Sequence, residues 1–301
     1  MISKIGLGTA QFGQDYGVAN VRGKVSESEV SEILDYARSV GINSLDTAFA
    51  YGVSESVIGE YLKRNPGSFK VVSKLPAFGQ YQPWKVEESL KQSMQRLGTG
   101  KLYGYLLHRF SDIIMCAGIW DDMIRLKQEG KIEKIGFSLY APAELVCLLD
   151  QGMNFDMVQV PYSVFDRRFE QYFDILNKKG VEIQVRSVFL QGLAFLDPAH
   201  LPVPLRGAQS CFERLHEISA EQGIAIETLC LNFVVLNTFI SKVLVGVDGL
   251  DHLKRNVKAL QSIDKVTDIY DRLQPIKVDQ EDILLPYKWG LNRLFAEKVK
   301  G

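Results

Sequence analysis

Short apolar runs alternate with longer segments of helical periodicity along the whole chain, and this alternation limits the possible folds more than any other feature. It predicts repeated strand–helix units and a parallel sheet, because neighbouring parallel strands need a crossover segment, usually a helix, between them. Eight such units can be counted. Their predicted strands cover Ser3–Leu7, Ile42–Leu45, Lys70–Ser73, Leu102–Leu107, Lys134–Phe137, Met157–Val160, Glu182–Val185 and Lys242–Val245.

Helix boundary signals occur between these strands. Ser26 and Glu29 have the spacing of a capping box, so a helix is predicted over Ser26–Val40, and Gly41 follows its end. The other predicted helices cover Trp84–Leu97, Ile119–Gln128, Phe169–Lys179 and Ile226–Leu236.

Eight units in 301 residues fit a single-domain (β/α)₈ barrel, the TIM-barrel class of α/β fold, over residues 1–301. A doubly wound sheet with a second domain fits less well, because no Pro-rich or Ser-rich linker divides the chain. The long irregular stretch Leu196–Gly207 contains three prolines and is predicted to be an extended loop over the end of the barrel. The tail after Pro286 is predicted to cap one end of the barrel or to border a pocket.

Positive and negative charges are nearly balanced, with 35 Lys and Arg against 36 Asp and Glu, and neither sign forms a long block. This argues against nucleic acid or an anionic membrane surface as the main partner. Because no signal-peptide pattern and no run of about 18 apolar residues is present, we expect a soluble, cytoplasmic protein that acts on a small molecule. The four cysteines and four histidines have no metal-ligand spacing, so no metal site is expected. The sequence does not indicate an oligomeric state.

Polar residues follow three neighbouring predicted strands at the point where each strand ends. Asp46 follows the second strand, Lys74 the third and His108 the fourth, while Tyr51 lies five residues after Asp46. In barrels of this kind the active site gathers at the carboxyl ends of the strands, so we expect these four side chains to converge. Since no nucleophilic Ser or Cys occupies a matching place, they predict a proton-transfer site.

Control of a tyrosine pKa explains why these residue types belong together. The ordinary pKa of a tyrosine is about 10, and a cation within about 4 to 6 Å lowers the pKa of an acid by about one to three units. Lys74 is predicted to be that cation for Tyr51, and Asp46 to keep the buried lysine charged. His108 is predicted to orient a carbonyl oxygen beside the Tyr51 hydroxyl. Such a site protonates an oxygen while another group supplies electrons.

The segment LDTAFAYGVSESVIG resembles the D-x-A-x-x-Y-G…E…I-G motif of the aldo-keto reductase family. The resemblance continues through SKLP, LLHRF, GKIEKIGFS, MVQVPYS and VLVGVDGLDHLKRN, and so extends over almost the whole chain. It implies reduction of an aldehyde or ketone by hydride from NADPH, with Tyr51 as general acid, Lys74 and Asp46 tuning it, and His108 orienting the carbonyl.

The same resemblance implies a set of cofactor-binding residues. Ser138 and Gln159 match the positions that hold the nicotinamide carboxamide, and Arg186 takes the place of the aromatic residue often stacked on the nicotinamide. Ser187 and the backbone near Leu190 match the pyrophosphate site. Gly246, His252 and Asn256 lie in the adenosine segment. A guanidinium can stack on a planar ring, although pairing of Arg186 with Glu182 or another carboxylate is an alternative.

At the adenosine end the chain departs from NADPH-specific members, which carry Lys or Arg just after the glycine. Here the residues are Val247, Asp248 and Gly249, and positive charge comes from His252, Lys254 and Arg255. An aspartate near the ribose favours a free 2′-hydroxyl and repels a 2′-phosphate, so NADH stays open beside NADPH.

Each of these residues taken alone also has an ordinary structural explanation. Asp46 is a possible helix cap, Tyr51 a packing residue and His108 a hydrogen-bonded core histidine. Among the aromatic residues, Tyr16, Phe49, Trp84 and Trp289 are candidates for a pocket wall or for packing. Two other functions compete with a reductase: a nicotinamide-nucleotide-binding sensor with little turnover, and a barrel enzyme that transfers protons on a sugar without cofactor. The Gly- and amide-rich opening LGTAQFGQDYGVAN is compatible with a polar, sugar-like substrate.

Overall fold

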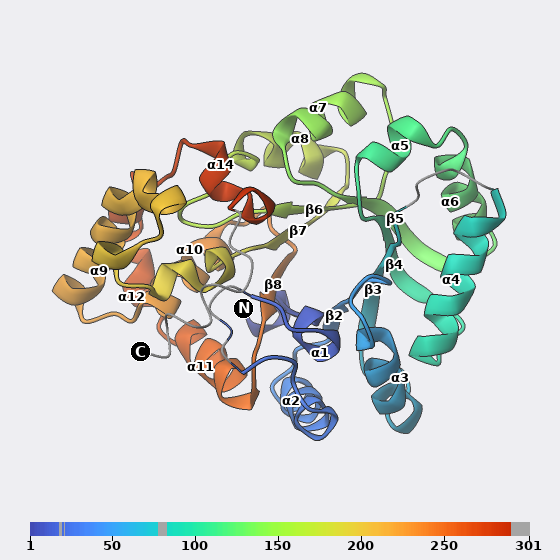
Figure 1. Ribbon diagram of the computed structural model, residues 1–301, viewed down its shortest axis with the longest axis horizontal. Coiled ribbons are helices and arrows are strands. Elements are labelled where there is room, and N and C mark those ends of the chain that lie inside the picture. The colour runs from blue at the N-terminus through green and yellow to red at the C-terminus, as the bar shows by residue number, and fades with distance from the viewer. Residues whose placement is uncertain (18–19, 21, 78–82, 290–301) are drawn as a thin grey trace.

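The eight predicted strands close into a parallel barrel in sequential order (Figure 1). The computed structural model describes residues 1–17, 20, 22–77 and 83–289, with Pro83 and Trp84 described by their backbone alone. The predicted (β/α)₈ barrel is therefore confirmed. The strands are β1 Ile5–Gly8, β2 Ser44–Asp46, β3 Lys70–Leu75, β4 Leu102–Leu107, β5 Ile132–Ser138, β6 Met157–Pro161, β7 Glu182–Arg186 and β8 Lys242–Gly246.

The strand register fixes which residues share a level at the carboxyl end of the barrel. Gly8 at the end of β1 pairs with Asp46 at the end of β2 and with Gly246 at the end of β8. Farther round the barrel, Ser138 pairs with Gln159. Residues more than 200 positions apart in sequence are therefore brought to one edge of the sheet.

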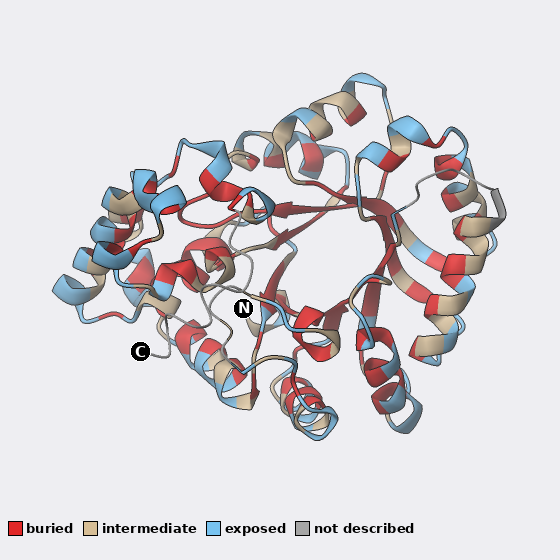
Figure 2. Cartoon of the chain, in the orientation of Figure 1, coloured by how far each residue is buried: buried red, intermediate tan, exposed pale blue. Residues whose placement is uncertain are grey.

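Helices surround the barrel and pack their apolar faces against it (Figures 1 and 2). In α2, for example, the buried residues Val30, Ile33, Leu34 and Ala37 have the spacing of one helix face. The helices are α1 Ala10–Gly13, α2 Glu27–Ser39, α3 Ser54–Arg64, α4 Pro83–Leu97, α5 Ser111–Met115, α6 Ile119–Gln128, α7 Pro142–Asp150, α8 Phe173–Lys178, α9 Gln209–Gln222, α10 Ile226–Leu236, α11 Leu250–Leu260, α12 Ile263–Thr267, α13 Tyr270–Leu273 and α14 Glu281–Leu284.

Several boundaries differ from the sequence predictions. The segment predicted as one helix over Phe169–Lys179 begins with a 3₁₀ turn, Glu170–Tyr172, before α8. The predicted loop Leu196–Gly207 contains 3₁₀ turns at Pro198–His200 and Val203–Ala208. Further 3₁₀ segments cover Ile2–Lys4, Leu190–Phe195 and Pro286–Lys288. Trp289 is buried and donates to the carbonyl of Ile283, while the rest of the C-terminal tail lies outside the described residues.

The start of α2 carries half of the predicted capping box. Ser26 accepts a hydrogen bond from the backbone N–H of Glu29, as the pattern requires. The Glu29 carboxylate, however, turns away from Ser26 and pairs with Arg22 and with the N–H of Leu250. The prediction was wrong for Glu29 because a cation and a free helix N–H from elsewhere in the chain compete for its carboxylate.

Within the described part of the chain no single helix is both long and apolar enough to cross a membrane. The segments Val203–Gln222 and Ile226–Leu236 meet those criteria only as a pair, and the pair is bent by 103°.

Candidate active site

Two glycines hold the turn that carries Tyr51 against the start of the barrel. Gly52 adopts the left-handed φ of +55°, which favours glycine. A Cβ on Gly52 would lie 2.3 Å from the carbonyl oxygen of Gly13, and a Cβ on Gly13 would lie 1.8 Å from that of Tyr51. Since no larger residue fits either position, the close backbone contact between α1 and this turn fixes where Tyr51 lies.

A buried glutamate supports the same turn from the other side. Glu55 accepts hydrogen bonds from Ser73 Oγ at 2.6 Å and from Arg96 Nη1 at 3.2 Å. The Arg96 guanidinium in turn lies 4.1 Å from the ring centroid of Phe49. The glutamate of the D-x-A-x-x-Y-G…E motif is thus a structural link between α3, β3 and α4.

Asp46, Lys74 and Gln159 form a fully buried polar cluster beneath Tyr51. Lys74 Nζ lies 2.7 Å from both carboxylate oxygens of Asp46 and 2.9 Å from the carbonyl oxygen of Thr47. These three hydrogen bonds use all three protons of the Lys74 ammonium. Gln159 Nε2 donates to Asp46 Oδ1 at 2.7 Å. The Lys74 side chain is 0% exposed, so its charge requires the carboxylate that the sequence predicted for it.

Tyr51 and His108 lie next to this cluster. Lys74 Nζ is 5.1 Å from the Tyr51 ring centroid, and the Tyr51 and His108 rings meet edge to face with centroids 5.8 Å apart. The structure therefore brings together the four residues that the sequence singled out, from β2, the turn after it, β3 and the end of β4.

The effect on the tyrosine is opposite to the predicted one. Burial and the nearby Asp46 carboxylate raise the pKa of Tyr51 above its ordinary value. The prediction of a lowered pKa was wrong because the charge of Lys74 is matched by Asp46, and the hydroxyl lies in a desolvated place. Tyr51 consequently keeps its proton at neutral pH.

His108 is neutral at physiological pH. Burial lowers the pKa of His108 to about 3, and the positive charges of Lys74, Arg186 and Arg109 act in the same direction. A neutral imidazole carries one N–H, so it can donate one hydrogen bond to a carbonyl oxygen.

A cavity of about 470 Å³ runs from Tyr51 along the ends of β1, β7 and β8. Seven of the sequence-predicted site residues line it: Asp46, Tyr51, Arg186, Ser187, Gly246, His252 and Asn256. Ser138, Gln159 and Lys74 are buried behind its wall. Leu190 also has a buried side chain, and its neighbours Phe189 and Gln191 line the cavity instead. His108 lines an adjoining open hollow of about 450 Å³.

The loop after β7 has unusual backbone geometry where it borders this cavity. Among the described residues, Ser187, Leu190 and Gln191 are the non-glycine residues with left-handed φ, at 64°, 46° and 55°. Backbone strain of this kind persists where the surroundings impose it, and it is common at ligand sites. Gln191 Nε2 also donates to the Tyr16 hydroxyl at 3.3 Å, which links this loop to the segment after α1.

These features fit a nicotinamide nucleotide. The cavity has a suitable volume and elongated lining, and Gln159 Oε1 is a buried acceptor without a hydrogen-bond partner beside the cavity-lining Asp46. A carboxamide N–H is a donor that such an acceptor suits. At Gly246 a Cβ would lie 2.7 Å from the side-chain amide of Gln11, so a larger residue here would displace that side chain in the cavity wall.

The far end of the cavity is organised by an ion pair that the sequence did not indicate. Arg22 pairs with Glu29 at 2.9 Å and donates to the carbonyl oxygen of Asp248 at 2.9 Å. Glu29 also accepts from the N–H of Leu250 at 3.2 Å. A Cβ on Gly249 would lie 1.9 Å from Arg22 Nη1, so the guanidinium rests directly on this glycine.

Asp248 and His252 face each other within the cavity wall. Asp248 Oδ2 lies 3.7 Å from His252 Nδ1, which accepts a hydrogen bond from the Asp248 N–H. Burial raises the pKa of Asp248 and lowers the pKa of His252. The cation Arg255 is exposed on the same segment and also lines the cavity.

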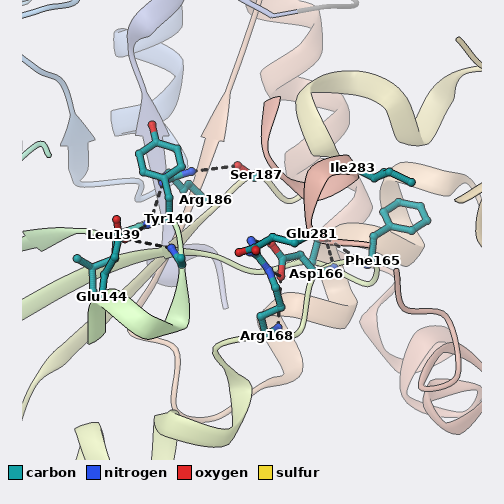
Figure 3. Close-up of polar contacts among 12 residues, drawn as sticks. Leu139, Tyr140, Glu144, Phe165, Asp166, Arg168, Arg186, Ser187, Glu281 and Ile283 are labelled. Carbon is teal, nitrogen blue, oxygen red and sulfur yellow. Dashed lines mark hydrogen bonds and ion pairs between the residues drawn. The ribbon is translucent and has the colours of Figure 1, made fainter. Parts of the chain in front are cut away.

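Within the described part of the chain Arg186 contacts neutral groups and forms no ion pair with a carboxylate. Its guanidinium lies 4.2 Å from the ring centroid of Tyr140 and donates to the carbonyl oxygen of Leu139 at 3.0 Å (Figure 3). The alternative of pairing with Glu182 is wrong, because that carboxylate binds Lys134 and Tyr103 at the opposite end of β7.

Sequence reasoning missed several residues of the cavity wall. Gln11 follows β1 just as Asp46 ends β2, so the strand-end rule applied to the first unit would have found it. Tyr16 lines the cavity as one of the four aromatic candidates. Of the others, Phe49 packs under Arg96 and Trp289 is buried, and the side chain of Trp84 lies outside the described residues.

The closed parallel barrel, with titratable side chains gathered at the carboxyl ends of its strands, defines a (β/α)₈ barrel enzyme. The chain belongs to the aldo/keto reductase family, because the model of that family matches residues 4–276. The general activity of the family is carbonyl reduction with a nicotinamide cofactor.

Individual relatives are similar over most of their length. The chain is 25% identical to the NADH-specific methylglyoxal reductase of Escherichia coli, over 86% of this chain and 90% of that protein. It is also 25% identical to L-galactose dehydrogenase of Arabidopsis thaliana, over 95% and 92%. Among solved structures, the holo form of an aldo-keto reductase from Bacillus halodurans matches with a TM-score of 0.71 at 23% identity, covering 92% of this chain and 94% of that one. This last likeness concerns the fold.

Proposed function

We propose that this protein reduces an aldehyde or ketone to the alcohol, with Tyr51 as the general acid. The observation that carries the proposal is the buried Asp46–Lys74 pair packed against Tyr51 and His108 beside a long cavity. When bound, the reduced nicotinamide nucleotide supplies the hydride. Tyr51 would give its hydroxyl proton to the carbonyl oxygen as that hydride reaches the carbonyl carbon, which leaves the alcohol.

The raised pKa of Tyr51 supports this role. An acid that keeps its proton at neutral pH can release it only when negative charge develops on a substrate oxygen beside it. Asp46 holds the Lys74 ammonium next to the Tyr51 ring, and Gln159 in turn donates to Asp46, while the Arg186 guanidinium is the cation that opposes the effect of burial on the Tyr51 pKa. Neutral His108 donates its N–H to the same oxygen and so orients the carbonyl.

The residues proposed to hold the nucleotide lie along the cavity. Ser138 and Gln159 are assigned to the carboxamide, and Ser187 with the strained backbone around Leu190 to the pyrophosphate. Gly246, His252 and Asn256 are assigned to the adenosine.

The adenosine end favours NADH over NADPH. Asp248 presents a carboxylate to the cavity beside the exposed Arg255, and Arg22, which donates to the Asp248 backbone, is paired with Glu29. A 2′-phosphate placed beside Asp248 would meet like charge, whereas a ribose hydroxyl can donate to it. The similarity to an NADH-specific reductase agrees with this preference.

The test is consumption of NADH and NADPH against reactive aldehydes and keto sugars, with wild type and Tyr51→Phe in parallel. We expect Tyr51→Phe to lower kcat/KM by about 10²- to 10⁴-fold while nucleotide binding, followed by fluorescence, persists. Asp248→Ser should move the preference toward NADPH.

Other outcomes favour the competing functions. Tight nucleotide binding without turnover of any compound would support a sensor. Failure to bind either nucleotide would support proton transfer without cofactor.

A further inference from the structure

Arg186 is a cation at the reacting end of the cavity that has no carboxylate partner among the described residues. It ends β7, is half-buried and lines the same cavity as Tyr51. Its contacts are the carbonyl oxygen of Leu139 at 3.0 Å, the Ser187 hydroxyl at 3.5 Å and the face of the Tyr140 ring. These are neutral groups, and they leave several guanidinium N–H donors available.

Carboxylates near Arg186 are occupied by other groups. Asp46 binds Lys74 and Gln159, and Glu144 accepts from the backbone N–H groups of Tyr140 and Ala141. Arg168, by contrast with Arg186, has its charge balanced, because it lies between the carboxylates of Asp166 and Glu281 at 2.8 Å each (Figure 3).

The uncompensated charge of Arg186 reaches the reacting residues. It lowers the pKa of His108, after burial and Lys74, and it opposes the effect of burial on the pKa of Tyr51. Because the charge of Lys74 is matched by Asp46, Arg186 leaves this end of the cavity with net positive charge.

We propose that Arg186 binds a carboxylate of the substrate, so that the protein reduces carbonyl compounds that also carry a carboxylate group. The inference rests on the proposed reductase function and names its substrate class. A planar guanidinium matches a carboxylate through two parallel hydrogen bonds. Tyr140 fixes the plane of the guanidinium from one side, which prepares its free N–H edge for such a ligand.

The experiment compares pairs of substrates in which one member carries an anionic group and the other a neutral group or none at the same position. Succinate semialdehyde is paired with butanal, 4-carboxybenzaldehyde with 4-carbamoylbenzaldehyde, and glyceraldehyde 3-phosphate with glyceraldehyde. For each pair the ratio of kcat/KM, anion to neutral compound, is measured in wild type, Arg186→Gln, Arg186→Lys and Arg109→Gln. Arg109 is the matched control, because it is an exposed arginine directly after His108.

We expect the wild type to favour both carboxylates and Arg186→Gln to lower that ratio by about 30-fold or more, whatever its effect on the neutral compounds. Arg186→Lys should recover part of the ratio, and Arg109→Gln should change it by less than about twofold. In a second readout, benzoate should bind the wild-type NADH complex, and Arg186→Gln should weaken that binding by a similar factor.

Four results would overturn the proposal. A ratio that is unchanged in Arg186→Gln excludes carboxylate recognition, and a loss confined to Arg109→Gln moves it to the other arginine. Selectivity for the phosphate pair alone identifies a phosphate site instead. An equal loss with charged and neutral compounds, together with weaker NADH binding, identifies a cofactor contact. If no compound of any pair is reduced, the proposed reductase function itself has failed, which is a separate result.

Discussion

At the Tyr51 end of the cavity the Asp46–Lys74 pair comes from neighbouring barrel strands and is buried, whereas at the Asp248 end the charged side chains come from loops and helices and are partly exposed. Lys74 is 0% exposed and binds Asp46 through both carboxylate oxygens. Arg22 is 54% exposed and reaches its partners across the gap between the N-terminal segment and α11.

This difference in burial separates two kinds of electrostatic interaction. A buried charge whose partner is removed keeps its desolvation cost, so the pair cannot be broken without a large loss of stability. An exposed pair is screened by water and contributes little to stability, although it can still hold a loop in place. A substitution at the Tyr51 end should therefore cost stability, and one at the Asp248 end should leave stability nearly unchanged.

The largest effect is expected when the buried pair is broken. Lys74→Met leaves Asp46 buried without its cation, so we expect the free energy of unfolding to fall by about 3 to 5 kcal/mol. Carbonyl reduction should fall by about 10²-fold or more, because the unpaired Asp46 carboxylate opposes loss of the Tyr51 proton more strongly. Chemical denaturation and steady-state kinetics measure the two effects.

The double variant Lys74→Met with Asp46→Leu is the control. It should recover most of the stability, since no unpaired charge remains, but none of the activity. Stability that is equally low in both variants would show that packing, and not charge, accounts for the loss.

The Tyr51 turn offers a second way to disturb the buried end. In Gly52→Ala the new Cβ would meet the Gly13 backbone at 2.3 Å in a left-handed conformation, so we expect a loss of about 2 to 4 kcal/mol and a lower kcat. Gly67→Ala is the matched control, because Gly67 has φ +72° and no atom within 4 Å of the new Cβ. Gly67→Ala should lose only the roughly 1 kcal/mol that a left-handed backbone conformation costs a residue with a side chain. Equal losses in the two variants would contradict a fixed Tyr51 turn.

The barrel, and the convergence of Asp46, Lys74 and His108 at one end of it, could be predicted from sequence because both depend on short-range patterns. The predicted strand Leu102–Leu107 is reproduced, and the ends of β2, β3 and β4 carry Asp46, Lys74 and His108. Strand-end positions converge in any closed parallel barrel, so no knowledge of long-range contacts was needed.

The rest depends on contacts that leave no periodic signal. Arg22 meets Asp248 across more than 200 residues, and Glu29 leaves its expected capping role to take part. The direction of the Tyr51 pKa shift was likewise beyond the sequence, because it depends on how completely Asp46 balances Lys74 and on the depth of burial.

The pH dependence of stability distinguishes the two ends through their histidines. The folded-state pKa of His108 is about 3, against about 6.5 in the unfolded chain, so between these values only the unfolded state gains a proton. Stability is therefore lost as pH falls through about 6.5, by about 2 kcal/mol at pH 5. His108→Gln should remove this part of the pH dependence.

His252→Gln is the comparison at the other end. Burial lowers the pKa of His252 too, but the Asp248 carboxylate opposes that shift, so we expect a smaller change in slope. Denaturation curves of wild type and both variants from pH 5 to 8 check this. Parallel curves for wild type and His108→Gln would contradict a buried neutral His108.

The smallest effect on stability is expected at the Arg22–Glu29 pair, where the consequence falls on binding. Arg22→Gln should change the free energy of unfolding by less than about 1 kcal/mol, because the pair is largely exposed. NADH binding should weaken by about three- to tenfold, since the Asp248 carbonyl oxygen loses its hydrogen bond from Arg22 and the Glu29 carboxylate that binds the Leu250 N–H loses its cation. Nucleotide fluorescence titration measures this change.

Gly249→Ala tests the same contact from the opposite side. Its Cβ would lie 1.9 Å from Arg22 Nη1, and the flexible guanidinium is the group that must move. We therefore expect Gly249→Ala to weaken NADH binding about as much as Arg22→Gln, and the double variant to bind no more weakly than either. Additive losses would mean that Gly249 and Arg22 act separately, and that the adenosine end is set by the glycine backbone and not by the arginine that rests on it.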